Sequence, residues 1–160
     1  MLDAGLTCSA SLPCPAEMGA SIHINGTGSS VVDTVFVCRQ TGLVPRRWIV
    51  GTATELANLI KQEIEALADG GLKSTQGDIR CIACGHMTRL AVWNLRRGWI
   101  RESTTTEKMT AVQSWYSSFG GLTAVLTELE TSFAHAPQKQ EWTSVGIVRD
   151  TSEDEYAIPF

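Results

Sequence analysis

The stretch VVDTVFVCR, residues 31–39, is rich in β-branched and aromatic side chains and predicts the clearest strand of the chain. Before it, LTCSASL (residues 6–12) alternates apolar and small polar residues, which is the pattern of a half-buried strand. Pro13 and Pro15 are expected to end that strand, and SIHIN (residues 21–25) alternates in the same way. The first quarter of the chain is therefore predicted to be mostly antiparallel β-structure.

The pattern downstream of this strand becomes helical. Thr52 and Glu55 have the spacing of a capping box and are followed by leucines and isoleucines at helical intervals, up to Gly70. A third helix is expected to begin at the threonines of residues 104–106, with Glu107 as the capping partner, and a glycine pair should separate it from a fourth. The predicted helices cover about residues 52–69, 78–95, 104–119 and 122–133.

The fold class predicted from these patterns is α+β, with an N-terminal antiparallel strand pair followed by about four helices. The expected division is terminal strands over residues 1–42, a helical extension over residues 43–149 and an acidic tail over residues 150–160. Within the extension, WTSVGIV (residues 142–148) is a candidate for a last short strand.

Composition limits the classes of protein to which the chain could belong. Its 160 residues suffice for one domain with a core, and 43% of them are hydrophobic. A net charge of −4 argues against a free-standing nucleic-acid-binding protein, although it allows a local basic face. No stretch is long and apolar enough for a membrane span, and no signal peptide is evident, so the five cysteines are expected to be reduced thiols in the cytoplasm.

The stretch RCIACGH (residues 80–86) contains the only C-x-x-C spacing and could be half of a zinc site, a redox pair or part of an ordinary helix. At about 100° per residue, His86 falls on an apolar stripe, Cys81 lies opposite that stripe and Cys84 falls on its flank. A helix therefore cannot bring the three side chains to one metal ion. The ordinary helix is favoured, with Gly85 allowing a close neighbour, and neither a phosphate loop nor a nucleophile elbow is recognised elsewhere.

Residues 3–42 resemble the closing segment of the catalytic fold in adenine-specific DNA methylases that use S-adenosylmethionine. In that family the last helix ends in an AGL turn, here residues 4–6, and an outward strand leads to a P…E corner, here Pro15 and Glu17. A final strand of the type D-x-V/I-F/L-V-C-R returns, here residues 33–39. GDIRCIACGHMTRLAVWN (residues 77–94) is similar to a helix in the C-terminal extension of the large methylases of this type.

The resemblance covers most of residues 3–119 but omits the family's chemistry. Neither the cofactor loop, rich in phenylalanine and glycine, nor the D/N/S-P-P-Y/F tetrapeptide that holds the flipped adenine occurs in this sequence. The resemblance therefore implies a C-terminal piece of a methylase of restriction–modification type, with no catalytic, cofactor-binding or metal-binding residue of its own. S-adenosylmethionine would serve the complete enzyme, and an upstream methylase half or another protein subunit would be the partner.

Arginines beside tryptophans suggest a contact with DNA. Arg46 and Arg47 precede Trp48, while Arg96, Arg97 and Arg101 surround Trp99, and this mixture suits phosphate contacts and base stacking. An alternative is that Arg96 and Arg97 only balance a helix dipole before Gly98. Two functions are therefore carried forward: a non-catalytic part of a DNA adenine methyltransferase, and a stand-alone interaction or regulatory module that has kept the fold and lost the chemistry.

Overall fold

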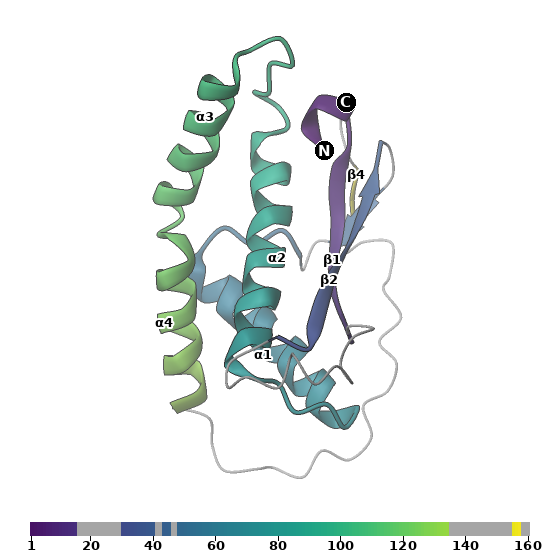
Figure 1. Ribbon diagram of the computed structural model, residues 1–160, viewed down its shortest axis with the longest axis vertical. Helices are drawn as coiled ribbons and strands as arrows, with labels where there is room; N and C mark the ends of the chain where they lie inside the picture. Colours follow the sequence, from purple (N-terminus) through teal and green to yellow (C-terminus); the bar gives the residue numbers. More distant parts are fainter. Residues whose placement is uncertain (16–29, 41–42, 46–47, 135–154, 158–160) are drawn as a thin grey trace.

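The computed structural model describes residues 1–15, 30–40, 43–45, 48–134 and 155–157 (Figure 1). The predicted strand SIHIN and the candidate strand WTSVGIV lie outside these residues, as do Arg46 and Arg47. The observed class is α+β, as the sequence predicted, with an antiparallel strand pair followed by helices. The elements are η1 (Leu2–Ala4), β1 (Thr7–Pro15), β2 (Val32–Arg39), β3 (Leu43–Pro45), α1 (Ala53–Asp69), α2 (Gln76–Leu95), α3 (Thr105–Ser118), α4 (Gly121–Ala134) and β4 (Glu155–Ala157).

Strands β1 and β2 form a two-stranded antiparallel ribbon. The expectation that the prolines break the first strand is wrong for Pro13, because β1 runs through it and pairs it with Thr34, whereas Pro15, paired with Val32, is the last residue of the strand. Prolines are tolerated in this position because β1 has only one ladder partner among the described strands. The register shifts between Cys8 and Ala10, so one extra residue is inserted there as a β-bulge.

Where the ribbon approaches α2 most closely, it places small polar residues against the helix. Ser11 is buried beneath Gly85 of α2, where a Cβ added to the glycine would lie 2.6 Å from the Ser11 Oγ. The alternation places Leu12 and its partner Val35 on the opposite face, and both are exposed. Gly85 thus permits the close approach that the sequence suggested, and only small side chains fit beneath it.

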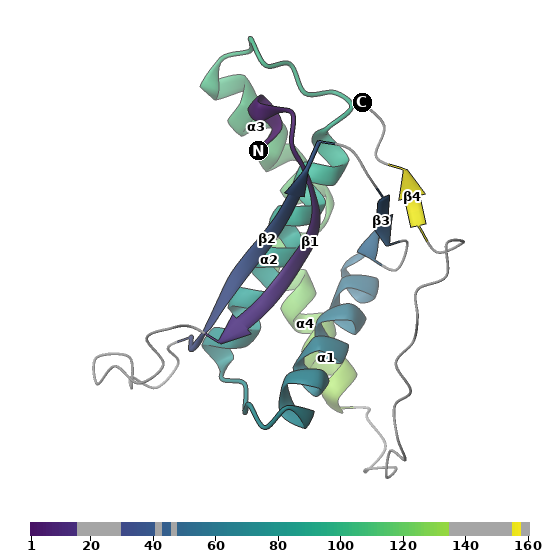
Figure 2. The same ribbon diagram turned by 90° about the vertical axis from the view of Figure 1, so that its right-hand side faces the viewer.

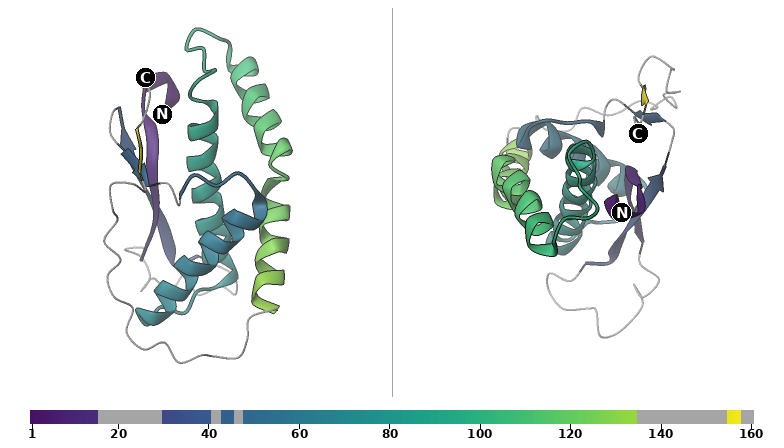
Figure 3. Two further views of the ribbon diagram at one scale, coloured as in Figure 1. Left: turned by 180° about the vertical axis from the view of Figure 1, so that it is seen from behind. Right: turned by 90° about the horizontal axis from the view of Figure 1, so that it is seen from above.

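Helix α2 is the central element of the fold. Figures 2 and 3 show it between the ribbon on one side and the α3–α4 pair on the other, with α1 crossing beside it. The predicted stripe packs into the core, but the opposite side of α2 is also buried, under the ribbon. The shared core of α1, α2, α4 and the ribbon is made of Val32, Leu56, Ala57, Leu59, Ile60, Ile82, Ala83, Met87, Leu90, Val125 and Leu129. Of the helices described, none is long and apolar enough to cross a membrane.

Threonine capping boxes start three of the helices. Those at Thr52 and Thr104 were predicted, whereas α2 begins at Gln76 with Thr75 as its N-cap, earlier than the sequence suggested. The partner of Thr75 is Asp78, which is fully buried and also accepts hydrogen bonds from the start of β2. A single carboxylate therefore fixes the N-terminus of α2 to the ribbon.

Glycines and a short second ribbon complete the architecture. Helices α3 and α4 follow one another end to end; Gly120 lies between them and Gly121 begins α4, with φ angles of 90° and 69°, which favour glycine (Figure 1). β4 pairs antiparallel with β3, although the sequence suggested only an acidic tail for residues 150–160. The backbone of residues 155–157 is thereby attached to the segment that leads into α1.

Candidate nucleic-acid interface

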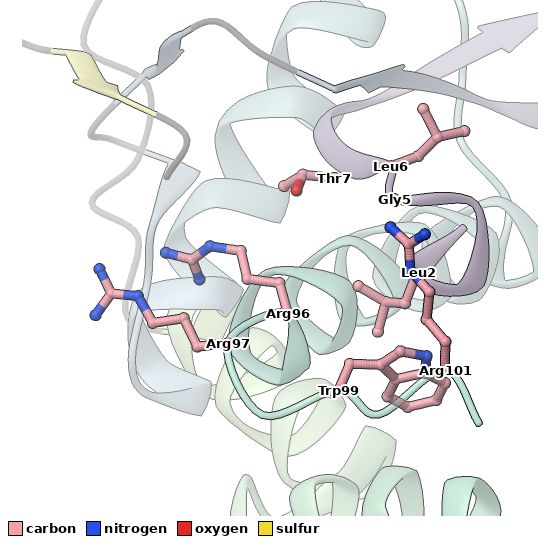
Figure 4. A pocket seen from close by; sticks show the side chains of 8 residues that line it. All are labelled: Leu2, Gly5, Leu6, Thr7, Arg96, Arg97, Trp99 and Arg101. Carbon is pink, nitrogen blue, oxygen red and sulfur yellow. The ribbon is translucent and has the colours of Figure 1, made fainter. Parts of the chain in front are cut away.

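Three of the five arginines expected to contact DNA line one pocket of about 430 Å³ (Figure 4). The pocket lies where α2 ends, between the loop that leads to α3 and the N-terminal turn of the chain. Its walls are made of Leu2, Gly5, Leu6, Thr7, Arg96, Arg97, Trp99 and Arg101. The lining contains three cations and no acidic residue, so the pocket is suited to an anionic group.

Arg96 and Arg97 form one side of the pocket. In Figure 4 their side chains extend to the same side of the loop, away from Arg101. The guanidinium of Arg96 lies over the Trp93 ring at 3.5 Å from its centroid, and it donates a hydrogen bond to the Trp93 carbonyl. Burial and the adjacent charge of Arg97 lower the pKa of Arg96. Arg96 therefore also lies at the C-terminus of α2 and binds one of its last carbonyls, in line with the alternative that its charge balances the helix dipole. Arg97, in contrast, is exposed and available to a ligand.

Arg101 approaches the N-terminal turn from the other side. Gly5 has a φ of 68°, and a Cβ there would lie 2.7 Å from Nη2 of Arg101. The absence of a side chain at Gly5 thus makes room for the guanidinium. Because Gly5, Leu6 and Thr7 join η1 to β1, the N-terminal turn and the ribbon together set the shape of the pocket.

Trp99 is held in place by an acidic residue that does not line the pocket. Its indole Nε1 donates to Oδ1 of Asp3 at 2.9 Å, and Nζ of Lys108 lies 2.8 Å from the same oxygen. Hydrogen bonds from Lys108 and then Trp99 lower the pKa of Asp3. Since Lys108 already pairs with Asp3, this carboxylate does not neutralise the pocket arginines.

The arrangement can bind phosphate by two means. Guanidinium groups form paired, charge-assisted hydrogen bonds with phosphate oxygens, and an indole offers a face on which a base can stack. The sequence singled out these arginines and Trp99, but it missed Leu2, Gly5, Leu6 and Thr7. These four residues reach the pocket because β1 packs beside α2, and no local motif in the sequence indicates this contact.

Trp48 does not belong to this pocket. Its ring lies 5.5 Å from the guanidinium carbon of Arg89 and makes an edge-on contact with His86, at 6.5 Å between centroids. Arg89 is only 1% exposed, and no described residue accepts a hydrogen bond from its Nε or Nη2. Burial lowers the pKa of Arg89 to about 10, while Cys8 and Glu63 act in the opposite direction. Trp48 therefore shields a buried cation.

The C-x-x-C segment lies apart from the pocket, and its side chains diverge as the helical rotation predicted. Cys81 contacts the Thr34 hydroxyl at 3.4 Å and Cys84 is exposed. His86 is buried, with Nε2 2.8 Å from Oε2 of Glu63. The three side chains of the motif do not form a common metal site.

Comparisons with known proteins give no match. No family model matches the chain, and neither a curated protein nor a solved structure is detectably similar to it. The assignment of a function therefore depends on the geometry and on the resemblance of the short motifs.

Proposed function

We propose that the chain is the C-terminal part of an adenine-specific DNA methyltransferase, which completes the fold of an upstream catalytic half and contacts DNA through the arginine pocket. The observation that carries the proposal is the uncovered apolar face of the β1–β2 ribbon. Leu12 is 38% exposed and Val35 is 46% exposed, although they are direct cross-strand partners. An apolar pair in this position fits a strand that another layer covers in a complete α/β domain.

The edges of the ribbon support a specific mode of docking. β1 contains Pro13 and Pro15, which cannot donate ladder hydrogen bonds, and β3 lies on its side of the ribbon (Figure 2). β2 contains no proline and is rich in β-branched residues, and among the described strands only β1 pairs with it. The free edge of β2 is therefore the one suited to receive a strand of the upstream half.

The chemistry of the complete enzyme would come from the partner. This chain lacks the cofactor loop and the P-P-Y/F tetrapeptide, so S-adenosylmethionine and the target adenine would be held by upstream residues. The three pocket arginines would add phosphate contacts, which position DNA without reading its sequence.

A second candidate is a non-enzymatic interaction module. It is favoured by the core of α1, α2 and α4, which already covers the inner face of the ribbon without a partner. Such a module would fold and bind its partner whether or not a catalytic half is present.

Reconstitution separates the two functions. Transfer of labelled methyl groups from S-adenosylmethionine to DNA would be measured with this chain alone, with an upstream half that carries the P-P-Y/F motif, and with both. The proposal predicts activity only when both are present. It also predicts that Val35→Glu abolishes copurification of the two halves, whereas Met109→Glu, at a similarly exposed position on α3, does not. A stable complex without methyl transfer would favour the interaction module.

Contact with DNA is tested separately by fluorescence anisotropy on the reconstituted complex. Arg97→Gln should weaken binding and reduce the slope of log K against log salt by about 1, the value for one phosphate contact. Arg80→Gln is the matched control, because Arg80 is also exposed and lies near the other end of α2. Equal effects of the two substitutions would contradict a role for the pocket.

A further inference from the structure

Two of the five cysteines face one another across the ribbon. Cys8 of β1 and Cys38 of β2 are direct register partners beside the bulge. Residues opposed in this way have Cα atoms about 4.5–5.5 Å apart, which lies within the range of about 4.4–6.8 Å found in disulfides. No local motif indicates this pair, because 29 residues separate the two cysteines in the sequence.

The other cysteines are less suited to form a bridge. Cys81 and Cys84 are three residues apart on α2, where Cβ atoms lie about 5–6 Å apart, farther than the roughly 3.5–4.5 Å of a disulfide. Cys14 is opposite Asp33 and therefore has no thiol as its register partner. Cys8 and Cys38 are thus the pair that the fold selects.

The surroundings of the two thiols give them different roles. Cys8 is fully buried and donates a hydrogen bond to the Ala10 carbonyl at 3.2 Å. Burial, with a smaller contribution from Cys38, raises the pKa of Cys8 to about 12, although the nearby Arg89 acts to lower it. Cys38 is only half-buried, so an oxidant meets Cys38 first.

We propose that Cys8 and Cys38 are a site of reversible disulfide formation by hydroperoxides. The Cys38 thiolate attacks the O–O bond of hydrogen peroxide, which forms a sulfenic acid and releases water after protonation. The Cys8 sulfur, with loss of its proton, then attacks the Cys38 sulfur, so that an S–S bond forms and the second oxygen leaves as water. Overall, two thiols and one peroxide give one disulfide and two waters, and peroxide accepts the two electrons.

Arg89 has a place in this reaction. Its guanidinium is buried and interacts electrostatically with Cys8. Two of its nitrogens, Nε and Nη2, have no hydrogen-bond acceptor among the residues that the structure describes. A buried cation beside a buried thiol stabilises the thiolate that must form during the second attack. The bridge would also fix Thr7, which directly precedes Cys8 and lines the arginine pocket.

The test treats the full chain with hydrogen peroxide, blocks the remaining thiols with N-ethylmaleimide in denaturant and maps the peptides by mass spectrometry. Trypsin leaves Cys8 and Cys38 in one peptide, so a protease that cleaves after Glu17 is needed. The expected product is a linked Cys8–Cys38 pair that a thiol reductant separates. It should be lost in Cys38→Ser, and Cys14→Ser and Cys84→Ser should leave it unchanged.

The proposal is overturned if Cys38 remains alkylatable, if it is oxidised only to sulfinic acid, or if the C-x-x-C thiols form a bridge instead. Circular dichroism of Cys38→Ser verifies that a lost bridge does not reflect a lost fold, because Cys38 is half-buried and tolerates a small replacement. None of these outcomes depends on methyl transfer or on DNA binding.

Discussion

Replacement of Asp78 by asparagine tests how α2 is fixed to the ribbon. Its Oδ1 accepts from Ser30 Oγ at 2.9 Å, Val31 N at 2.7 Å and Val32 N at 3.0 Å. Its Oδ2 accepts from the backbone N of Thr75 at 2.7 Å and from its hydroxyl at 2.8 Å. Five donors thus converge on one buried carboxylate, and no described lysine or arginine pairs with it.

The loss of stability expected for Asp78→Asn follows from these hydrogen bonds. An asparagine that keeps its oxygen toward the ribbon retains three bonds, but each loses the advantage of a charged acceptor, about 1 kcal/mol. Its amide group then faces the Thr75 N–H, and the loss of this part-buried hydrogen bond costs about 1–3 kcal/mol. The sum is about 4–6 kcal/mol, a large part of the total stability of about 5–15 kcal/mol of a typical domain.

The assay is urea unfolding followed by circular dichroism, with Asp33→Asn as the control. Asp33 is exposed on β2, the strand whose first residue donates to Asp78, so its replacement should change the unfolding free energy by less than about 0.5 kcal/mol. A loss below about 1 kcal/mol in Asp78→Asn, with an unchanged dependence on urea, would refute the reasoning.

The same substitution predicts a dependence on pH. Burial acts to raise the pKa of Asp78, but the hydrogen bonds from Thr75, Ser30 and Val31 outweigh it and hold the pKa below the usual value of 3.8. The folded state therefore binds this proton less readily than the unfolded state. The contribution of the Asp78 carboxylate to the free energy of unfolding is fully present above the usual pKa, and it is lost as the pH falls through the lowered pKa. The stability difference between the wild type and Asp78→Asn should therefore shrink in acid below about pH 4.

Three other substitutions or treatments test the packing. Gly85→Val should destabilise the fold by about 2–3 kcal/mol in urea unfolding, because a Cβ there meets the Ser11 hydroxyl at 2.6 Å; an unchanged midpoint would mean that the ribbon can move away. Arg89→Met should be neutral or stabilising, because it replaces a buried charge, two of whose nitrogens have no acceptor among the described residues, by an apolar group of similar length, and a loss above about 2 kcal/mol would indicate an acceptor outside the described residues. Oxidation of Cys8 and Cys38 closes a loop of about 30 residues and should add about 3–4 kcal/mol, seen in calorimetry as a rise in Tm of about 10 °C that Cys38→Ser lacks.

Local signals in the sequence predicted most of the elements. The capping boxes at Thr52 and Thr104 and the β-branched run of β2 act within a few residues, so their outcome depends little on the rest of the chain. The glycine pair at the junction of α3 and α4 is a local signal of the same kind, because its effect on the backbone does not depend on distant residues. The arginines of the pocket were recognisable because they lie close together in the sequence.

Contacts between distant residues were not predictable in this way. The alternation in LTCSASL did not reveal the bulge after Cys8, beyond which Ser11 lies under Gly85 of α2 and Leu12 is exposed. The pairing of Cys8 with Cys38 depends on the register of two strands, and the pairing of β3 with β4 joins residues 43–45 to residues 155–157, which lie far apart in the sequence. Each of these features is set by the tertiary arrangement.

The bulge between Cys8 and Ala10 reverses the alternation of side chains between the two faces of β1. Ser11 and Cys8 are three residues apart, so a regular strand would turn them to opposite faces, yet the extra residue lets both face α2. Everything N-terminal to the bulge, including the wall of the arginine pocket, takes its orientation from this single insertion. Deletion of one residue at the bulge would turn the preceding side chains of β1 to the opposite face of the ribbon. The length of β1 is therefore as strictly constrained as its composition.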